Sequence, residues 1–264
     1  MKFSQTMLFS ALLLVSIAQS CANGGADNTP FNAQILPAAS KITDVRITDL
    51  NCWVEKDQFC VCGICVNESP NWQKIWLQGS PINAMGESVR IHGSNAAIFP
   101  TFSSAVAPSG RTSFFAFWPL SDFEGQPDSC HVTVAGATQK SAGPVLLVDQ
   151  ISAVKMLVPS KQDSSIQEEV ALQINAVLNN PLSMQAQHPR LELLLFGKDN
   201  RLWFTTMLNP EDPQTRQMMG LEREGPMQAG EKRGVGVYAF YERLPNALQE
   251  TRIGRVEMLA FEER

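Results

Sequence analysis

Five of the six cysteines are spaced so that they could form disulfides or hold a metal ion: Cys52, Cys60, Cys62, Cys65 and Cys130. Zinc sites with four cysteine ligands generally use two separate C-x-x-C pairs, and this chain has one, Cys62-Gly-Ile-Cys65. That pair lies in an apolar, strand-like run and does not open a helix, so it also departs from the usual redox motif. We therefore expect structural disulfides, with metal binding as the alternative and no bound cofactor.

The pairing of these five thiols stays open, because they allow at most two bridges and leave one thiol over. Side chains alternate along a strand, so Cys60 and Cys62 share one face while Cys65 points to the other. The preferred pairing joins Cys52 to Cys60 or Cys62, and uses Cys130 in a second bridge.

Residues typical of catalysis are few. The chain has three histidines, at 92, 131 and 188, and nothing around them selects a nucleophile or an acid–base pair. Phosphate-binding loops, nucleophile elbows and metalloprotease motifs are absent from the sequence. The paired carboxylates Glu168-Glu169 and Glu262-Glu263 point to opposite faces of a strand, so we expect them to be solvated surface residues. We expect no enzymatic activity.

Aromatic residues gather in the first half of the chain and suggest a binding surface. Phe115 and Phe117 alternate on one predicted strand and are expected in the core. The neighbouring aromatics cannot all face inward as well, which predicts some exposed apolar surface. The binding candidates are Trp72, Phe114 and Trp118.

Short apolar runs alternate with turns rich in Pro, Gly and Asn, which predicts an all-β fold. The clearest hairpin joins Leu191–Gly197 to Arg201–Leu208. Two stretches look like copies of one unit, since the segment from Ile47 resembles the one from Ile151, an offset of 104. Ile64-Cys-Val-Asn67 likewise matches Ala176-Val-Leu-Asn179.

The number and spacing of these strands resemble those of immunoglobulin-like domains. The resemblance implies two tandem immunoglobulin-like β-sandwiches, at 41–148 (Cys-rich) and 149–264. Trp76 falls on the presumed third strand of the first copy, where such domains carry a tryptophan, and Leu194 lies near that position in the second. The junction at 141–149 is short and apolar, which predicts a restricted hinge.

The first 20 residues have a basic start, an apolar run and small residues before Cys21, which is typical of a secretory signal. Ile17-Ala-Gln-Ser-Cys21 resembles the lipobox of bacterial lipoproteins, although Ala18 stands where Leu is commonest. The resemblance implies a signal peptide at 1–20, a lipid on Cys21 and, with Ala22 next, sorting to the outer membrane. Residues 21–40 then form a flexible tether.

Charge excludes nucleic acid as a partner, because 21 basic residues face 26 acidic ones and the net charge is −5. The leading hypothesis is a non-catalytic lipoprotein of the cell envelope, anchored to the membrane by lipid, that serves as a scaffold or assembly subunit for a protein partner. The alternatives are an adhesive, carbohydrate-binding surface lipoprotein and a metal-binding protein.

Overall fold

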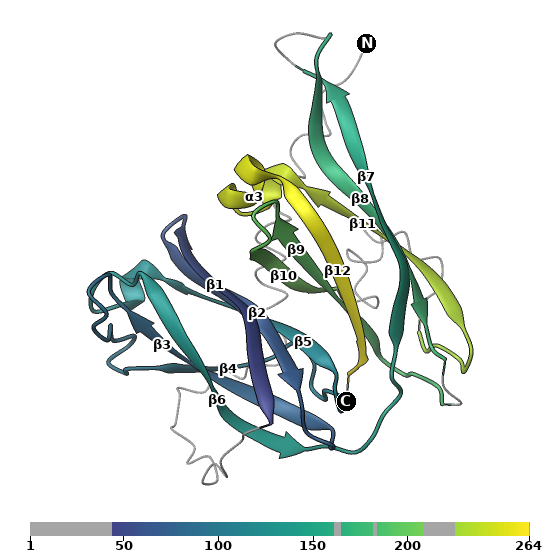
Figure 1. The fold of residues 1–264 in the computed structure, drawn as a ribbon, viewed down its shortest axis with the longest axis horizontal. Helices are drawn as coiled ribbons and strands as arrows, with labels where there is room; N and C mark the ends of the chain where they lie inside the picture. The colour runs from purple at the N-terminus through teal and green to yellow at the C-terminus, as the bar shows by residue number, and fades with distance from the viewer. Residues whose placement is uncertain (1–43, 161–164, 182–183, 209–224, 264) are drawn as a thin grey trace. The chain divides into compact units, whose positions relative to one another are not determined.

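The computed structural model describes residues 44–160, 165–181, 184–208 and 225–263 (Figure 1). The signal peptide, Cys21 and the tether lie outside these residues. The described part is nearly all β-strand, with one short helix, α3 (Asn246–Thr251), and two single 3₁₀ turns. This confirms the predicted all-β fold.

The strands fall into two sets, each of which makes two three-stranded antiparallel sheets. The first set, called module 1 below, has the sheets β1-β2-β5 and β4-β3-β6. Its strands are β1 (Val45–Glu55), β2 (Gln58–Asn67), β3 (Gln73–Ile82), β4 (Ala97–Pro100), β5 (Arg111–Pro119) and β6 (Ser129–Gln139).

The second set, module 2, repeats this order with the sheets β7-β8-β11 and β10-β9-β12. Its strands are β7 (Leu147–Pro159), β8 (Gln167–Asn179), β9 (Pro189–Gly197), β10 (Leu202–Leu208), β11 (Lys232–Phe240) and β12 (Ile253–Glu262). Leu146 is already buried in the core of module 2. The predicted boundary at 148/149 therefore falls inside β7.

A buried asparagine makes the same contacts in both modules. The Asn67 amide donates to the carbonyls of Asn71, Val106 and Ala107, and the Asn180 amide donates to those of Met184, Met227 and Gln228. Asn67 therefore corresponds to Asn180, one residue beyond the sequence match.

The first strands of the modules share an irregularity that corrects the expected offset of 104. Strand pairing slips between Thr48 and Asn51 in β1 and between Asp149 and Ser152 in β7. Asp49 and Gln150 both have positive φ there, 51° and 54°. The two strands therefore correspond at an offset of 101, so Cys52 matches Ala153 and not Met156.

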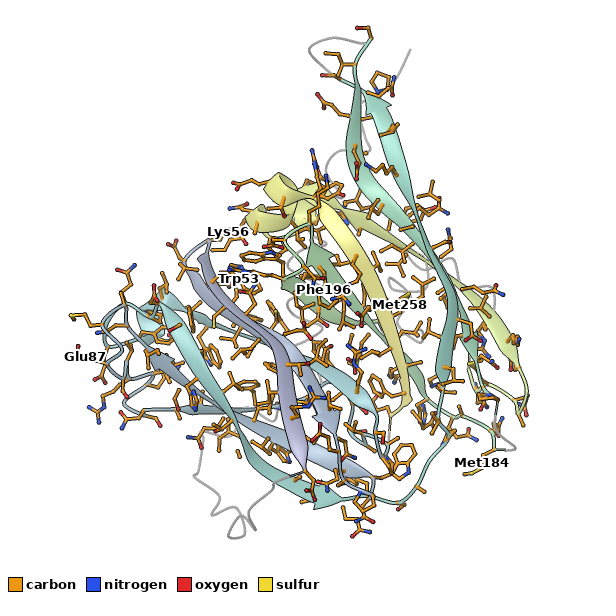
Figure 2. All side chains as sticks on the ribbon, in the orientation of Figure 1. Trp53, Lys56, Glu87, Met184, Phe196 and Met258 are labelled. Carbon is orange, nitrogen blue, oxygen red and sulfur yellow. The ribbon has the colours of Figure 1, made fainter. Side chains whose placement is uncertain are left out.

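Each module buries one core between its two sheets, and a third apolar cluster joins the modules. In β2, Phe59, Val61 and Cys65 face the core of module 1, whereas Cys62 and Ile64 face the joining cluster. From module 2 the joining cluster takes Leu194, Phe196 and Leu202; Figure 2 labels Phe196 together with Trp53, which packs against the cluster from β1. Strands β2 and β9 are thus buried on both faces, which explains their continuous apolar sequence.

We predict that the two asparagines differ in their contribution to stability. In Asn67→Ala the carbonyls of Asn71, Val106 and Ala107 each lose one donor, so the free energy of unfolding should fall by about 2–4 kcal/mol. Asn180→Ala should cost roughly 1 kcal/mol less, because the Asn180 Oδ1 is buried and has no donor among the described residues, whereas the Asn67 Oδ1 accepts from Ser69. Urea denaturation measures both, and equal or reversed costs would contradict this account.

Candidate functional site

The most exposed apolar surface of module 2 lies on the hairpin of β7 and β8. We call it the hairpin tip and define it by five large apolar residues that are 38–56% exposed: Ile151, Val154, Leu157, Val158 and Ile166. β7 is an edge strand, paired with β8 alone. No other strand of the described residues pairs with the outward edge of β7.

The outer part of the hairpin tip, which carries Leu157, Val158 and Ile166, is an extension that module 1 lacks. In module 1, Glu55 pairs with Gln58 across a tight turn formed by Lys56 and Asp57. The corresponding pair in module 2 is Met156 and Ala171, and the hairpin continues beyond it through Leu157–Glu169, Val158–Glu168 and Pro159–Gln167. Figure 1 shows this hairpin running past the other strands of its sheet.

One ion pair fixes the base of the extension. Glu169 lies 2.7 Å from the Lys155 ammonium and accepts a 2.6 Å hydrogen bond from the Tyr241 hydroxyl. Partial burial alone would raise the pKa of the Glu169 carboxyl, but these two contacts lower it overall. Glu168, on the opposite face, accepts from the Ser160 hydroxyl. The adjacent glutamates point to opposite faces, as expected. Each also makes a contact within the hairpin or its base, in addition to any contact with solvent.

The second predicted pair of surface carboxylates is also structural. Glu262 is only 6% exposed and accepts hydrogen bonds from the main-chain N–H groups of Gln187 and His188. Glu263 forms an ion pair with the buried Arg190 at 2.7 Å. The expectation of solvated surface is therefore wrong for Glu262.

The five cysteines are free thiols in the structure, four of them buried. As expected, Cys60 and Cys62 lie on the face of β2 opposite to Cys65. Cys52 packs on the core face, because the irregularity in β1 sets it opposite Val61. A bridge from Cys52 to Cys60 or Cys62 would have to pass through the sheet, so this preferred pairing is wrong.

Burial also makes these thiols poor metal ligands. It raises the pKa of Cys60, Cys65 and Cys130 to about 12, and that of Cys62 well above its usual range. Among the described residues no group of three or more His, Cys, Asp or Glu side chains is arranged to hold a metal ion. The predicted C-x-x-C pair is split between the two faces of β2.

The aromatic binding candidates are mostly not at the surface. Phe114 is fully buried, with its ring 5.7 Å from that of Phe99, so it cannot bind a ligand from solution. Trp118 is half-buried and packs on the same Phe99 ring at 5.8 Å. Trp72 is half-buried, and its carbonyl accepts from the Lys140 N–H.

The predicted faces of β5 are reversed. Phe114 and Ala116 line the core of module 1, whereas Phe115 and Phe117 are on the other face, where Phe115 packs against Trp53 and Phe204. The sequence pattern FFAFW is apolar on both faces, so alternation alone could not select the core side. Trp76 is also on an outer face, with the Lys74 ammonium over its ring, which differs from the buried tryptophan of immunoglobulin domains.

The histidines are separate from one another in the structure. His92 lies in a turn and contacts Asp122 at 3.2 Å, while His131 is exposed on β6. His188 precedes β9 in module 2 and donates its N–H to Glu262. The structure therefore does not combine them into one site.

A fully buried carboxyl group, which the sequence pattern did not indicate, lies between the modules. Glu192 on β9 accepts from the Thr112 hydroxyl at 2.7 Å, and from the Ser113 N–H and hydroxyl at 2.5 and 2.6 Å. The Ser113 hydroxyl also lies 2.6 Å from the hydroxyl of Thr205. A lone Glu in the apolar run LELLLFG was the only sequence signal.

Desolvation dominates the chemistry of Glu192. It raises the pKa of the carboxyl to about 7, although the hydrogen bonds from Ser113 and Thr112 and the charge of Arg111 lower it. A serine hydroxyl on a carboxyl group could in principle be activated as a nucleophile. Here Ser113, Thr112 and Glu192 are all fully buried, so no substrate reaches them. The cluster is a structural bond between β5 and β9.

We predict that Glu192 makes stability fall as the pH rises from about 4.5 to 7. The folded state keeps the proton at a pH where the unfolded chain, with an ordinary pKa of 4.5, has lost it. The free energy of unfolding should therefore drop by roughly 3 kcal/mol across this window through Glu192 alone. Denaturation at several pH values, compared with Glu192→Gln, isolates the contribution, because the variant cannot titrate. An identical pH slope in both proteins would contradict it.

Among the described residues, none of the helices has the length and apolar character of a membrane span. No protein-family model matches the chain, and no curated protein matches it either.

Among solved structures, the chain is similar to a transglutaminase of red sea bream, with 15% identity, 74% of this chain and 27% of that one covered, and a TM-score of 0.20. It is also similar to a calcium-binding mutant of Bacteroides uniformis beta-glucuronidase 2, with 12% identity, coverage of 72% and 23%, and a TM-score of 0.18. The chain spans about a quarter of these proteins, and similarities this low assign no activity.

Proposed function

We propose that this chain is an exported, lipid-anchored protein of the bacterial envelope that binds a protein partner through the hairpin tip. The observation that carries the binding role is the tip itself, an unpaired edge strand with large apolar side chains in water. Monomeric proteins rarely keep a contiguous apolar patch exposed unless it meets another molecule. Adding a strand to such an edge is a common mode of peptide and protein recognition.

The difference between the two modules supports a role for the tip. Module 1 closes its first hairpin with a tight turn, so the extension is not needed to form this type of sandwich. The extension adds the exposed side chains of Leu157, Val158 and Ile166. Exposing them gives module 2 no stability, whereas covering them with a partner recovers about 25 cal/mol for each Å² of apolar area.

Features of the edge also restrict what it binds. Edge strands commonly avoid pairing with unrelated strands through a charged side chain, a bulge or a proline. β7 has all three, in Lys155, its two register slips and Pro159. They leave Ser152–Met156 in regular pairing with β8. A partner strand therefore pairs with a short segment and places its own apolar side chains against Val154 and Leu157.

The lipid anchor rests on the sequence. Cys21 follows an apolar run and small residues, in the arrangement that resembles a lipobox. Two or three acyl chains bind a protein to a membrane stably, because each buried methylene contributes about 0.8 kcal/mol. The anchor and tether would hold the modules beside the membrane where an envelope partner is met.

We predict that Val154→Lys and Leu157→Lys each weaken partner binding about tenfold or more, because a charge must then be buried at the contact. Both side chains are more than half exposed, so the free energy of unfolding should change by less than about 0.5 kcal/mol. A photo-reactive residue at Ile166 identifies the partner in intact cells, and its crosslinked yield measures the loss.

The matched control is Met85, which is 79% exposed but lies in module 1. Met85→Lys should leave the crosslink unchanged. A crosslink to a second copy of the chain would identify self-association as the function of the tip. If both lysine variants crosslink as the parent does, or if none forms in any protein, the tip is not a binding surface.

We predict that Cys21→Ser releases the protein from the membrane fraction. The parent protein should carry the mass of attached acyl chains on a polypeptide that begins at Cys21, and intact-mass measurement of the membrane fraction detects this. Ser20→Ala, which keeps a small residue before the cysteine, is the control and should remain lipidated. An unmodified parent protein in the soluble fraction would rule out the anchor.

A further inference from the structure

Two cysteines face each other at one open side of module 1. β1 and β6 are edge strands of the two sheets, and they lie beside each other in Figure 1. The irregularity in β1 turns Cys52 toward the core, where both Cys52 and Cys130 pack against the same cluster. Burial raises the pKa of the Cys52 thiol, while the nearby backbone of Cys130 lowers it, so the two residues lie close together.

The missing side chain of Gly79, on the neighbouring strand β3, leaves room for the Cys130 sulfur. A Cβ added at Gly79 would lie 3.2 Å from the Cys130 sulfur and 3.0 Å from the Phe99 ring. A larger residue at position 79 would therefore require the Cys130 sulfur and the Phe99 ring to shift by a few tenths of an ångström. The glycine on β3 and the slip in β1 are separate features that bring the two side chains to one position.

We propose that Cys52 and Cys130 form a disulfide that fastens β1 to β6 and closes this side of module 1. The other three thiols lie too far from Cys52 and Cys130, or on the wrong face of the sheet, to join this bridge. Cys60 and Cys62 are on the opposite face of β2, and Cys65 shares the core but pairs in register with Ile47, several residues along the sheet from Cys52. The five cysteines thus divide into one pair and three single thiols.

The bond forms by two exchange steps. The thiolate of one cysteine attacks a disulfide donor, such as a thiol–disulfide oxidoreductase or oxidised glutathione, and releases one donor thiol. The second cysteine then attacks this mixed disulfide and releases the other donor thiol. The chain loses two protons and two electrons, and the donor is reduced to two thiols. The oxidising compartment rests on the proposed export, whereas the pairing does not.

Exposure and charge indicate the order of events. Cys52 is half-buried while Cys130 is 6% exposed, so the donor meets Cys52 first. Burial raises the pKa of both thiols, that of Cys130 to about 12. Thiolates are therefore scarce in the closed sandwich near neutral pH, and the bridge should form fastest while the strands are still assembling or as the pH rises.

The test is a disulfide map of the full chain. The protein is purified from membranes in detergent under reducing conditions, oxidised with oxidised glutathione at about pH 8.5, blocked with an alkylating reagent, and digested without reduction. We expect a single linked peptide pair, Cys52 with Cys130, while Cys60, Cys62 and Cys65 are recovered alkylated. A bridge between any other pair, or none after oxidation, overturns the proposal.

Thermal unfolding gives an independent readout. A bridge between distant residues restricts the unfolded chain, so reduction should lower the Tm of the oxidised parent by roughly 5–15 °C. Cys52→Ala with Cys130→Ala should remove this response to reductant, whereas Cys65→Ala, a buried thiol of the same core, should keep it. A response to reductant that survives in the double variant contradicts the assignment.

The same disulfide map made in intact cells distinguishes this proposal from the proposed function. Thiols are trapped with acid and alkylating reagent before lysis, and the same peptides are mapped. A bridge in cells supports both proposals. Reduced Cys52 and Cys130 in cells, with a bridge formed by the purified protein, would leave the pairing intact and count against export to an oxidising compartment.

Discussion

The packing of the β1-β2-β5 sheet against the β10-β9-β12 sheet is the constraint on which the rest of the structure depends. The central strands of these sheets, β2 and β9, are covered on both faces, so each must satisfy its own core and the joining cluster at once. In the middle of this dry contact Glu192 binds Thr112 and Ser113 through three short hydrogen bonds. Removing those donors would leave a buried carboxyl without partners, which costs far more than an apolar mismatch. The contact therefore has one register, set by the Glu192 bonds.

The rest of the contact follows this register. The Cys62 thiol and the Asn51 amide both donate to the Leu202 carbonyl, at 3.4 and 2.9 Å. At the rim, Arg111 forms a 3.0 Å ion pair with Glu257 of module 2. Polar groups thus satisfy one another across an otherwise apolar surface, which is what a fixed contact requires. The two modules also share a buried apolar cluster.

The sequence could predict strands, turns and repetition, but not which apolar face meets which partner. In β5 the run Phe114–Trp118 is apolar on both sides, and the choice between them depends on the second module. The offset between the first strands was wrong by three residues, because the matching irregularity at Asp49 and Gln150, which fixes their correspondence, leaves no clear mark in the residue pattern. The faces of Cys60, Cys62 and Cys65 were right, since they depend only on alternation along one regular strand. Pairing with Cys52 failed because it depends on that slip.

Residues at equivalent positions of the two modules lie in different environments. Trp53, Cys62 and Phe117 in module 1 correspond to Val154, Asn175 and Tyr238 in module 2. Cys62 belongs to the joining cluster and Trp53 packs against it, 5.6 Å from the Trp203 ring, whereas Val154 is 56% exposed.

Polar substitution explains most of that difference, because Asn175 and the neighbouring Gln173 can remain hydrated and need no cover. Val154 is different, because it keeps a more than half exposed apolar side chain on the face that also carries the stacked rings of Tyr238 and Phe240. This exposed apolar edge of module 2 is where the proposed partner would bind.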